Sequence, residues 1–484
     1  DGCLQDVLVT YDQNGSMATT QESQGSDMGL FGGLLGWDAS DERLVVADRA
    51  LEGACIRVRI EIADFGADHP NTYKLTLANS KERHDMTAVS TGGGAIEILQ
   101  IDGAAVSMAG DCFETLIFLD SRDEEVHEHL SRHVDADEIL LLRGPDTQFV
   151  ECKSQERMPE SILSWLDSVR GVRCIRTLSP VLPVLSRADR RVPFITCQQM
   201  LRYNETRDLH LWELAVHYES AWGSLSHDEV LARMEDIART MQESIRLGVE
   251  GTDHPDRILG YQSGLFRYQV AEGRLLDAGV LNEMILATTA MMEMKSSMGL
   301  IVAAPTAGAC GGLPGACVGA ARSMGLSLDQ MTRALLAAGM IGVFIAAHAT
   351  FAAEIGGCQA ECGAGSGMAA SALVTLAGGT TNQAIAAASM ALQNTLGMIC
   401  DPVANRVEVP CLGKNVMAAA NALACANMAL ADFDAVIPLD EVIETMDRVG
   451  RSIPRELRCT GLGGLSVTRT SREIEKRLSS SHSA

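Results

Sequence analysis

Three cysteines lie where glycine or proline interrupts helix-forming sequence in the carboxy-terminal half of the chain. Cys358 follows two glycines, Cys400 stands two residues before a proline, and Cys411 follows a proline. Loops leave such thiolates free to converge on a metal, and three thiolates suit a cubane iron–sulfur cluster whose fourth iron stays open for a substrate. A single cysteine is more often a small core residue, so both interpretations stay open at this point.

Helices must position these cysteines. Helix formers fill residues 195–478, and Ala, Gly and Met dominate the middle of this stretch. Small side chains let helices pack closely, so some of them are expected to be buried all round. Capping boxes, in which an N-cap oxygen is followed three residues later by a reciprocating side chain, predict helix starts at Ser226, Ser327 and Thr380. We therefore predict a large all-α domain over residues 195–478, followed by a polar tail, 479–484.

Composition excludes several classes of function. The formal net charge of −24 gives a surface that repels nucleic-acid phosphates and anionic lipid headgroups, so we expect neither nucleic acid nor membrane as a partner. The uncharged run 334–353 contains His348, and a helix buried in the all-α domain explains it better than a membrane span. Fourteen scattered cysteines without a signal peptide favour a reducing cytoplasm. The first residue is Asp1 and not Met, which suggests a processed or truncated start.

The first 190 residues predict two smaller units, so the expected fold class is a multidomain α+β protein. Within residues 1–103, Ile56, Val58, Ile60 and Ile62 alternate with charged side chains as in a half-buried strand, and mixed strand and helix signals predict an α/β domain. Residues 104–190 follow the order βαββαβ of a ferredoxin-like unit and resemble an ACT domain, a regulatory module whose members often bind amino acids. A linker with Pro and Arg, residues 180–193, leads to the all-α domain. The expected strands are 6–11, 56–62, 73–77, 95–99, 114–119, 138–142, 147–151 and 172–177, and the expected helices are 25–35, 121–133 and 159–170.

Five pieces of the helical part resemble the catalytic part of the iron–sulfur-dependent L-serine dehydratases. They occur in the order that this family has, and the intervals between the three cysteines are similar as well. The pieces are Val302–Gly315, Gly357–Glu361, Cys400–Val403, Pro410-Cys411 and Gly461–Leu465.

The amino-terminal half extends this resemblance to nearly the whole chain, which indicates a fused β, ACT-like and α arrangement. Two features differ from the family: its Pro-Ser-Ser-Ser-His opening is absent, and Gln24 stands where Gly-His is usual. The segments similar to the β-type domain of the family are Gly15–Ala18, Gly25–Asp27, Leu34–Gly36, His69–Thr72 and Gly92–Ala95.

The resemblance implies a cofactor and an activity. Cys358, Cys400 and Cys411 would hold a [4Fe-4S] cluster, whose open iron would act as a Lewis acid on the β-hydroxyl of L-serine. A base would remove the α-proton, and the resulting aminoacrylate would give pyruvate and ammonia without pyridoxal phosphate. The family also implies a small-molecule amino-acid substrate, a homodimer and a cytoplasmic location.

The carboxylate of that substrate is expected to bind near Thr306. A Pro-Thr-x-Gly loop exposes a hydroxyl together with the backbone amides around Ala307 and Gly308, although Thr306 could equally cap a helix. Ser366, in the glycine-rich loop expected after Cys358, is a further candidate donor to the substrate. Its Gly-Ser-Gly surroundings are also ordinary loop sequence.

Several side chains are candidates for the base. His348, Lys295 and His69 come first, and Glu361 and Lys414 are further candidates. His348 lies on an apolar helix, where a hydrogen bond to a backbone carbonyl is the commoner role. His69 precedes a proline and could simply close a turn.

Other interpretations stay open. We expect Cys310, Cys362 and Cys459 to be packing residues, because the glycines around Cys362 interrupt the helix that a CxxxC metal pair would need. The alternative functions are a related iron–sulfur lyase for L-cysteine or L-threonine, and a non-catalytic amino-acid sensor that uses the ACT-like unit. Zinc is disfavoured because the sequence has no CxxC spacing.

Overall fold

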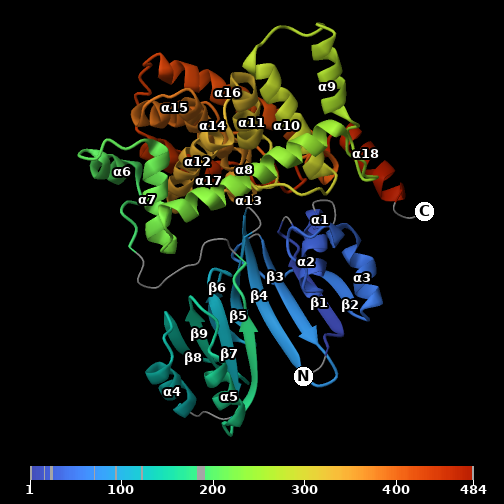
Figure 1. Cartoon of the computed structure of the whole chain (residues 1–484). Helices are drawn as coiled ribbons and strands as arrows, with labels where there is room; N and C mark the ends of the chain where they lie inside the picture. The colour runs from blue at the N-terminus through green and yellow to red at the C-terminus, as the bar shows by residue number, and fades with distance from the viewer. Residues whose placement is uncertain are drawn as a thin grey trace.

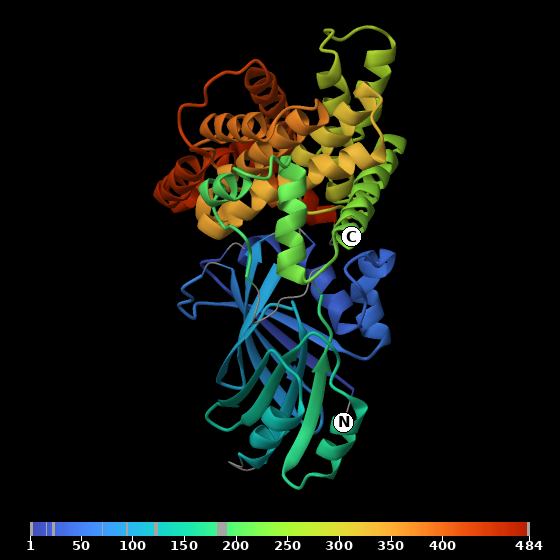
Figure 2. The same ribbon diagram turned by 60° about the vertical axis from the view of Figure 1, so that its left-hand side comes forward.

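The computed structural model describes residues 3–15, 17–21, 25–69, 71–92, 95–120, 124–181 and 191–481. Two β-sheets lie below a helical domain in the view of Figure 1, and the turned view of Figure 2 shows the same arrangement. The predicted multidomain α+β class is confirmed.

The first sheet has six strands and is bordered by short helices. Its elements are β1 (Asp6–Asp12), α1 (Met17–Thr20), α2 (Ser26–Leu34), η1 (Glu42–Val46), α3 (Ala47–Gly53), β2 (Arg57–Ala63), β3 (Thr72–Ala78), β4 (Arg83–Gly92), β5 (Ala95–Ile101) and β6 (Ala104–Met108). The strand order is β2-β1-β3-β4-β5-β6, with only β1 and β2 parallel among the described strands. A parallel pair needs a crossover connection, which α2 and α3 provide. The four strands predicted in this part are confirmed within two residues.

The first sheet continues past the predicted boundary between residues 103 and 104. β6 pairs with β5, so residues 104–108 belong to this sheet and not to the next unit. The reason is the turn between them: Asp102 and Gly103 have φ of 49° and 81°. Two positive φ values are typical of a two-residue hairpin turn, whose twist matches that of the strands.

The second sheet has the βαββαβ topology expected from the sequence. Its elements are β7 (Phe113–Leu119), α4 (Glu125–His133), β8 (Glu138–Arg143), β9 (Gln148–Ser154), α5 (Glu160–Ser168) and β10 (Val172–Leu178). The strand order β10-β7-β9-β8, with all neighbours antiparallel, is that of a ferredoxin-like unit. Residues 121–123 of the expected first helix lie outside the described residues. We call this second unit the ACT-like unit.

The ACT-like unit is packed on both faces. Val150 and Ile117 lie in a core beneath α4 and α5. The opposite face packs against the first sheet, where Phe118 and Phe149 share a core with Ile101. Figures 1 and 2 both place this unit at the end of the first sheet that is farthest from the helical domain.

The helical domain follows residue 191. Its longer helices are α6 (Cys197–Asn204), α7 (Leu211–Gly223), α8 (His227–Glu250), α9 (Gln262–Ala271), α10 (Val280–Ser296), α11 (Gly312–Met324), α12 (Leu328–His348), α14 (Cys362–Leu376), α15 (Thr381–Gln393), α16 (Cys411–Leu430), α17 (Leu439–Ser452) and α18 (Arg469–Ser481). Short turns are α13 (Ala353–Gly356), η2 (Cys358–Ala360), η3 (Val403–Asn405), η4 (Arg455–Leu457) and η5 (Gly464–Val467). The predicted capping boxes at Ser226, Ser327 and Thr380 are confirmed.

Two further expectations concern helix ends and burial. α12 is long and apolar enough to cross a membrane, but 67% of its apolar window is buried inside the protein, as expected for a core helix. α18 extends into the predicted polar tail as far as Ser481. The helix continues because Leu478, in its last turns, is buried. Residues 482–484 lie outside the described part of the chain.

Candidate active site

Five cysteine thiols gather where η2, α14 and α16 meet the loops before η3 and after η4. The thiol of Cys358 is hydrogen-bonded to those of Cys362 and Cys400, and Cys400 is also bonded to Cys459. Cys411 lies near enough to Cys358 for their charges to interact. The five residues are between 2% and 8% exposed. The three predicted ligands are therefore close together, accompanied by two thiols that we had expected to be packing residues.

Cys362 and Cys459 reach the site for different local reasons. Cys358 opens the 3-10 turn η2 and Cys362 opens α14, so one turn of chain separates the two thiols although no continuous helix joins them. Cys459 is held by a short bridge between two loops: its amide donates to the Cys400 carbonyl at 3.0 Å, and the Cys400 amide donates to the Leu457 carbonyl at 2.8 Å. As the glycines indicated, the helix is interrupted between Cys358 and Cys362, yet the two thiols lie close together.

Polar side chains fix the loops that carry the thiols. Gln359 donates to the Met446 carbonyl at 2.6 Å and accepts from the Gly397 amide at 2.8 Å. Lys414, predicted as a candidate base, instead holds the loop of Cys400, because its ammonium donates to the Ile399 carbonyl at 2.7 Å and to Asp401 at 2.8 Å.

The thiols share protons unequally. Hydrogen bonds from the thiols of Cys362 and Cys400 lower the pKa of Cys358 well below its ordinary value. The same bonds raise the pKa of Cys362 and Cys400, with burial acting in the same direction. Of these three groups, Cys358 is therefore the one whose thiolate form is most favoured.

The donor set is suitable for an iron–sulfur cluster. Thiolates are the usual ligands of such clusters, and the burial of these five cysteines keeps water from their sulfurs. The described residues contain no group of three or more His, Cys, Asp or Glu side chains already arranged around a metal position. The sulfurs of Cys358, Cys362, Cys400 and Cys459 instead contact one another.

The predicted carboxylate-binding loop lies beside the thiols. The Thr306 hydroxyl donates to Glu361 at 2.7 Å and accepts from the Ala309 amide at 3.2 Å. It does not cap a helix, because α11 begins later, at Gly312. Gly308 lies so close to Glu361 that an added Cβ would be 3.0 Å from the carboxylate oxygen. The Thr306 hydroxyl is thus already used, and Ala307 is the exposed residue of this loop.

Glu361 has an unusual environment for a carboxyl group. Burial, followed by the nearby Cys358 and Glu354, raises its pKa to about 8. Its bond from Thr306 and its closeness to Lys295 oppose this shift. The group therefore lies between the thiols and the loop as a carboxyl that can exist with or without its proton near neutral pH.

Ser366 does not lie in a loop. The predicted loop after Cys358 is the helix α14, and Ser366 is fully buried in it. Its hydroxyl donates to the Ala418 carbonyl at 2.8 Å and accepts from Asn421 at 2.9 Å, which joins α14 to α16. Its proton is therefore not available to a substrate. The glycines that suggested a loop serve close helix packing: an added Cβ on Gly367 would be 2.9 Å from Leu392.

The three first candidates for the base occupy different places. Lys295 ends α10 and is buried, and its charge interacts with Cys310, Cys411 and Glu361. Burial lowers its pKa. His348 is exposed at the end of α12 and bonds the Ile195 carbonyl at 3.1 Å, the backbone contact considered from the sequence.

His69 is contributed by the first sheet. It lies in the β2–β3 loop, where its ring accepts from the Asn71 amide at 3.1 Å, so it does close a turn. Its charge also interacts with Glu354 of α13, four residues before Cys358. Burial lowers the pKa of His69. This loop is thus where the first sheet approaches the thiols, consistent with the position of β3 and β4 below α13 in Figure 1.

Sequence reasoning missed Asn415, whose amide contacts the loop, α11 and two cysteines. Its position four residues after Cys411 places both on one face of α16, which was the signal available. The expected packing role of Cys310 agrees with its place, 3.9 Å from the Met292 sulfur. Gln24, the position that differs from the family pattern, lies outside the described residues.

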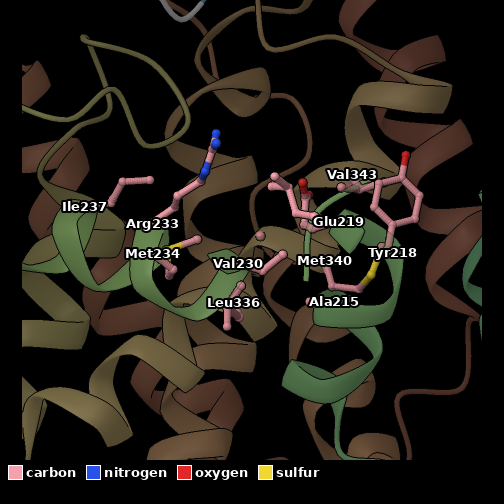
Figure 3. A pocket seen from close by; sticks show the side chains of 12 residues that line it. Ala215, Tyr218, Glu219, Val230, Arg233, Met234, Ile237, Leu336, Met340 and Val343 are labelled. Carbon is pink, nitrogen blue, oxygen red and sulfur yellow. The ribbon is translucent and has the colours of Figure 1, made fainter. Parts of the chain in front are cut away.

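A separate pocket lies between α7, α8 and α12 (Figure 3). It has a volume of about 210 Å³ and is lined mainly by apolar side chains such as Leu336 and Met340. Glu219 and Arg233 are its charged residues, and none of the five thiols lines it. It lacks the convergent polar groups of a reaction site, so the thiols and the Thr306 loop are the candidate active site.

Known proteins match this part of the chain. The family model "Serine dehydratase alpha chain" matches residues 206–466, which include all five thiols and the Thr306 loop. A probable L-serine dehydratase alpha chain of Bacillus subtilis is 34% identical over 285 residues, covering 59% of this chain and 95% of the relative. The L-serine dehydratase alpha chain of Peptoniphilus asaccharolyticus is also 34% identical, with 58% of this chain and 97% of the relative covered.

A longer relative gives the same result. L-serine dehydratase 1 of Escherichia coli is 34% identical over 283 residues, which are 57% of this chain and 62% of the relative. The matches cover the helical domain, which carries the thiols, and the alpha-chain relatives are covered almost completely. This chain belongs to the serine dehydratase alpha-chain family, the iron–sulfur type of L-serine dehydratase.

Proposed function

We propose that this protein is an L-serine ammonia-lyase that converts L-serine to pyruvate and ammonia. The observation that carries the proposal is the gathering of Cys358, Cys400 and Cys411 beside the Thr306 loop, in a chain of this family. The relatives named above are L-serine dehydratases, which supports serine as the substrate. L-threonine and L-cysteine are the alternative substrates to compare.

The three cysteines would hold a [4Fe-4S] cluster. When bound, a cluster with an open iron supplies a Lewis acid that helps the β-hydroxyl to leave. The amides of Ala307 and Gly308 would bind the substrate carboxylate, since the Thr306 hydroxyl is engaged by Glu361.

Lys295 is the side chain best placed to accept the α-proton. It lies near both Cys411 and Glu361, and therefore between a cluster ligand and the carboxylate loop. Burial favours its neutral form, which has the free electron pair that a base needs. The α-proton would pass to its nitrogen as hydroxide leaves. The aminoacrylate would then become an imine, and water would release pyruvate and ammonia.

The remaining features of the proposal concern the whole protein. A reducing cytoplasm is the compartment that suits it, because all fourteen cysteines are free thiols. We also propose a homodimer and a regulatory amino-acid site in the ACT-like unit. Sigmoid dependence of the rate on L-serine, lost when residues 113–178 are perturbed, would support such a site.

Anaerobic reconstitution with iron and sulfide tests the central proposal. The loaded protein is expected to show charge-transfer absorbance and to form a 2-oxo acid from L-serine faster than from L-threonine or L-cysteine. Cys400→Ser should lower iron content and activity together. Cys425→Ser is the matched control, because Cys425 is equally buried on α16 but lies away from the thiol group. Absence of absorbance, or equal effects of the two substitutions, would reject the cluster site.

A further inference from the structure

Asn415 connects the two halves of the candidate active site. It lies on α16, one turn after Cys411, and its side chain is 0% exposed. A buried amide must satisfy two donors and an acceptor oxygen, so each of its contacts contributes to the local structure.

The oxygen and the nitrogen of the Asn415 side chain both make hydrogen bonds. Its oxygen accepts from the backbone amides of Gly311 at 3.1 Å and Gly312 at 2.8 Å, at the start of α11. Its nitrogen donates to the carbonyl of Gly308 at 3.0 Å and to that of Cys411 at 2.9 Å. The same nitrogen lies 3.6 Å from the sulfur of Cys362.

The contact with Gly308 fixes one peptide plane from two sides. In a trans peptide the C=O and the following N–H point in opposite directions. The Gly308 carbonyl is bound by Asn415, and the amide of the same peptide, from Ala309, donates to Thr306. Thr306 in turn donates to Glu361. Asn415 and Thr306 therefore fix together the peptide between Gly308 and Ala309, which directly follows the amides proposed to bind the carboxylate.

We infer that Asn415 is a positioning residue, which holds the carboxylate-binding loop at a set distance from the cysteines on α14 and α16. The inference rests on the proposed function, because that function assigns the carboxylate to this loop. Asp at this position would keep the acceptor but lose both donors, so it would release the Gly308 carbonyl. The loop binds the carboxylate in the ground state and in the transition state alike, so its loosening should raise KM more than it lowers kcat.

A matched control lies on the same helix. Asn421 is also an amide that bridges helices, with bonds to Ser366 at 2.9 Å and to the Ala391 carbonyl at 3.0 Å. These contacts join α16 to α14 and α15 away from the loop. If a bridging asparagine served only helix packing, the two positions would respond alike.

The experiment compares Asn415→Asp with Asn421→Asp in the reconstituted full-length protein. For Asn415→Asp we expect unchanged iron content, a KM for L-serine raised about tenfold, which corresponds to about 1.4 kcal/mol of binding, and a kcat changed less. Weaker binding of L-alanine, which has the carboxylate but no hydroxyl to lose, should accompany the KM effect. Asn421→Asp should leave KM and L-alanine binding as in the wild type.

A second variant keeps the inference testable if Asn415→Asp does not fold. Thr306→Val removes the hydroxyl contact on the other side of the same peptide, while the bond from the Ala309 amide to the Thr306 carbonyl at 3.2 Å remains. It should raise KM and weaken the binding of L-alanine in the same direction. Equal KM values for Asn415→Asp and Asn421→Asp, or a wild-type KM for Thr306→Val, would overturn the inference alone. A wild-type protein that carries the cluster but does not turn over L-serine would overturn the proposed function and the inference with it.

Discussion

Lys295 is the residue on which the proposed chemistry depends most. A lysine that ends a helix normally extends into water, where its charge complements the helix dipole. Lys295 is instead 8% exposed, and its titratable neighbours are Cys310, Cys411, Glu408 and Glu361. Burial disfavours the ammonium form, and these neighbours oppose that effect. A buried lysine at this place needs a reason other than stability, and proton transfer provides one.

Replacing this amine tests its role. Lys295→Met keeps the length and apolar stem of the side chain, so we expect kcat for L-serine to fall by about 10²–10⁴-fold, the usual contribution of a general base, with unchanged iron content. His69→Gln is the comparison, because His69 is the candidate base contributed by the other domain. Steady-state kinetics and iron analysis of both variants decide between them. If only His69→Gln abolishes turnover, the base is His69.

The residue scale is also where sequence and structure differ most. The resemblance of the motifs to those of the iron–sulfur serine dehydratases, rather than the spacing alone, predicted that Cys358, Cys400 and Cys411 lie together. The loop around Ser366 was predicted wrongly, because glycines that allow helices to approach resemble the glycines of a loop. The bonds of Thr306 and Asn415 could not be predicted, because their partners lie 55 and 107 residues away.

Glycine determines how closely the helices approach one another. α11 packs against α10 through Gly315, where an added Cβ would be 2.6 Å from the Thr288 Cα. Such a distance forces backbone and not only side chains to move. α11 begins directly after the Thr306 loop, and α10 ends at Lys295, so this helix pair connects the proposed base to the carboxylate loop.

A methyl group added at Gly315 should therefore force α10 and α11 apart. We expect Gly315→Ala to destabilise the protein by about 1–3 kcal/mol, the usual cost of overpacking. Gly339→Ala on α12 is the matched control, since an added Cβ there meets nothing within 4 Å. It should stabilise the helix by about 0.5–1 kcal/mol. Urea unfolding of the two apo variants measures both values. Changes of the same sign would contradict the packing argument.

At the scale of secondary structure, helices and strands could be predicted from the sequence better than the contacts between them. Local strand signals predicted eight of the strands, and capping boxes predicted three helix starts, because both kinds of signal are local. β4 and the hairpin strand β6 were not predicted. The assignment of β6 to the first sheet depends on pairing with β5, which sequence periodicity does not specify.

At the scale of the whole molecule, two carboxyl groups lie between the sheets. Glu114 of β7 is on the same face as Leu116 and Phe118, which pack against the first sheet. Glu151 of β9 lies beside it, and both are buried. Burial, and then the charge of Glu151, raises the pKa of Glu114 to about 8. The interface between the ACT-like unit and the first sheet therefore contains a pair of carboxyl groups, and burial favours the protonated form of Glu114 in this pair.

These two carboxyl groups should make the stability of the interface between the two sheets depend on pH. The folded pKa of Glu114 lies above its ordinary value of 4.5, so its contribution to stability is fully present below about pH 4.5 and is lost as the pH rises toward about 8. Glu114→Gln has a side chain that is neutral at every pH, so the loss of stability at higher pH should disappear. We expect this substitution to raise the free energy of unfolding at pH 8 by at most about 4 kcal/mol, since the pKa is raised from 4.5 to about 8 and one pKa unit corresponds to about 1.4 kcal/mol.

Thermal unfolding at about pH 5 and about pH 8 distinguishes this effect from a general change in packing. Glu114→Gln should have a higher midpoint than the wild type at pH 8 and nearly the same midpoint at pH 5. The control is Glu156→Gln in the loop after β9, which removes an exposed carboxylate from the same unit and should change neither midpoint. Lys153 of β9, which opposes the raised pKa, bonds the Ser107 carbonyl of β6 and so holds the sheets together in both variants. An equal loss of stability at both pH values in Glu114→Gln would show that the carboxyl group serves packing and not proton binding.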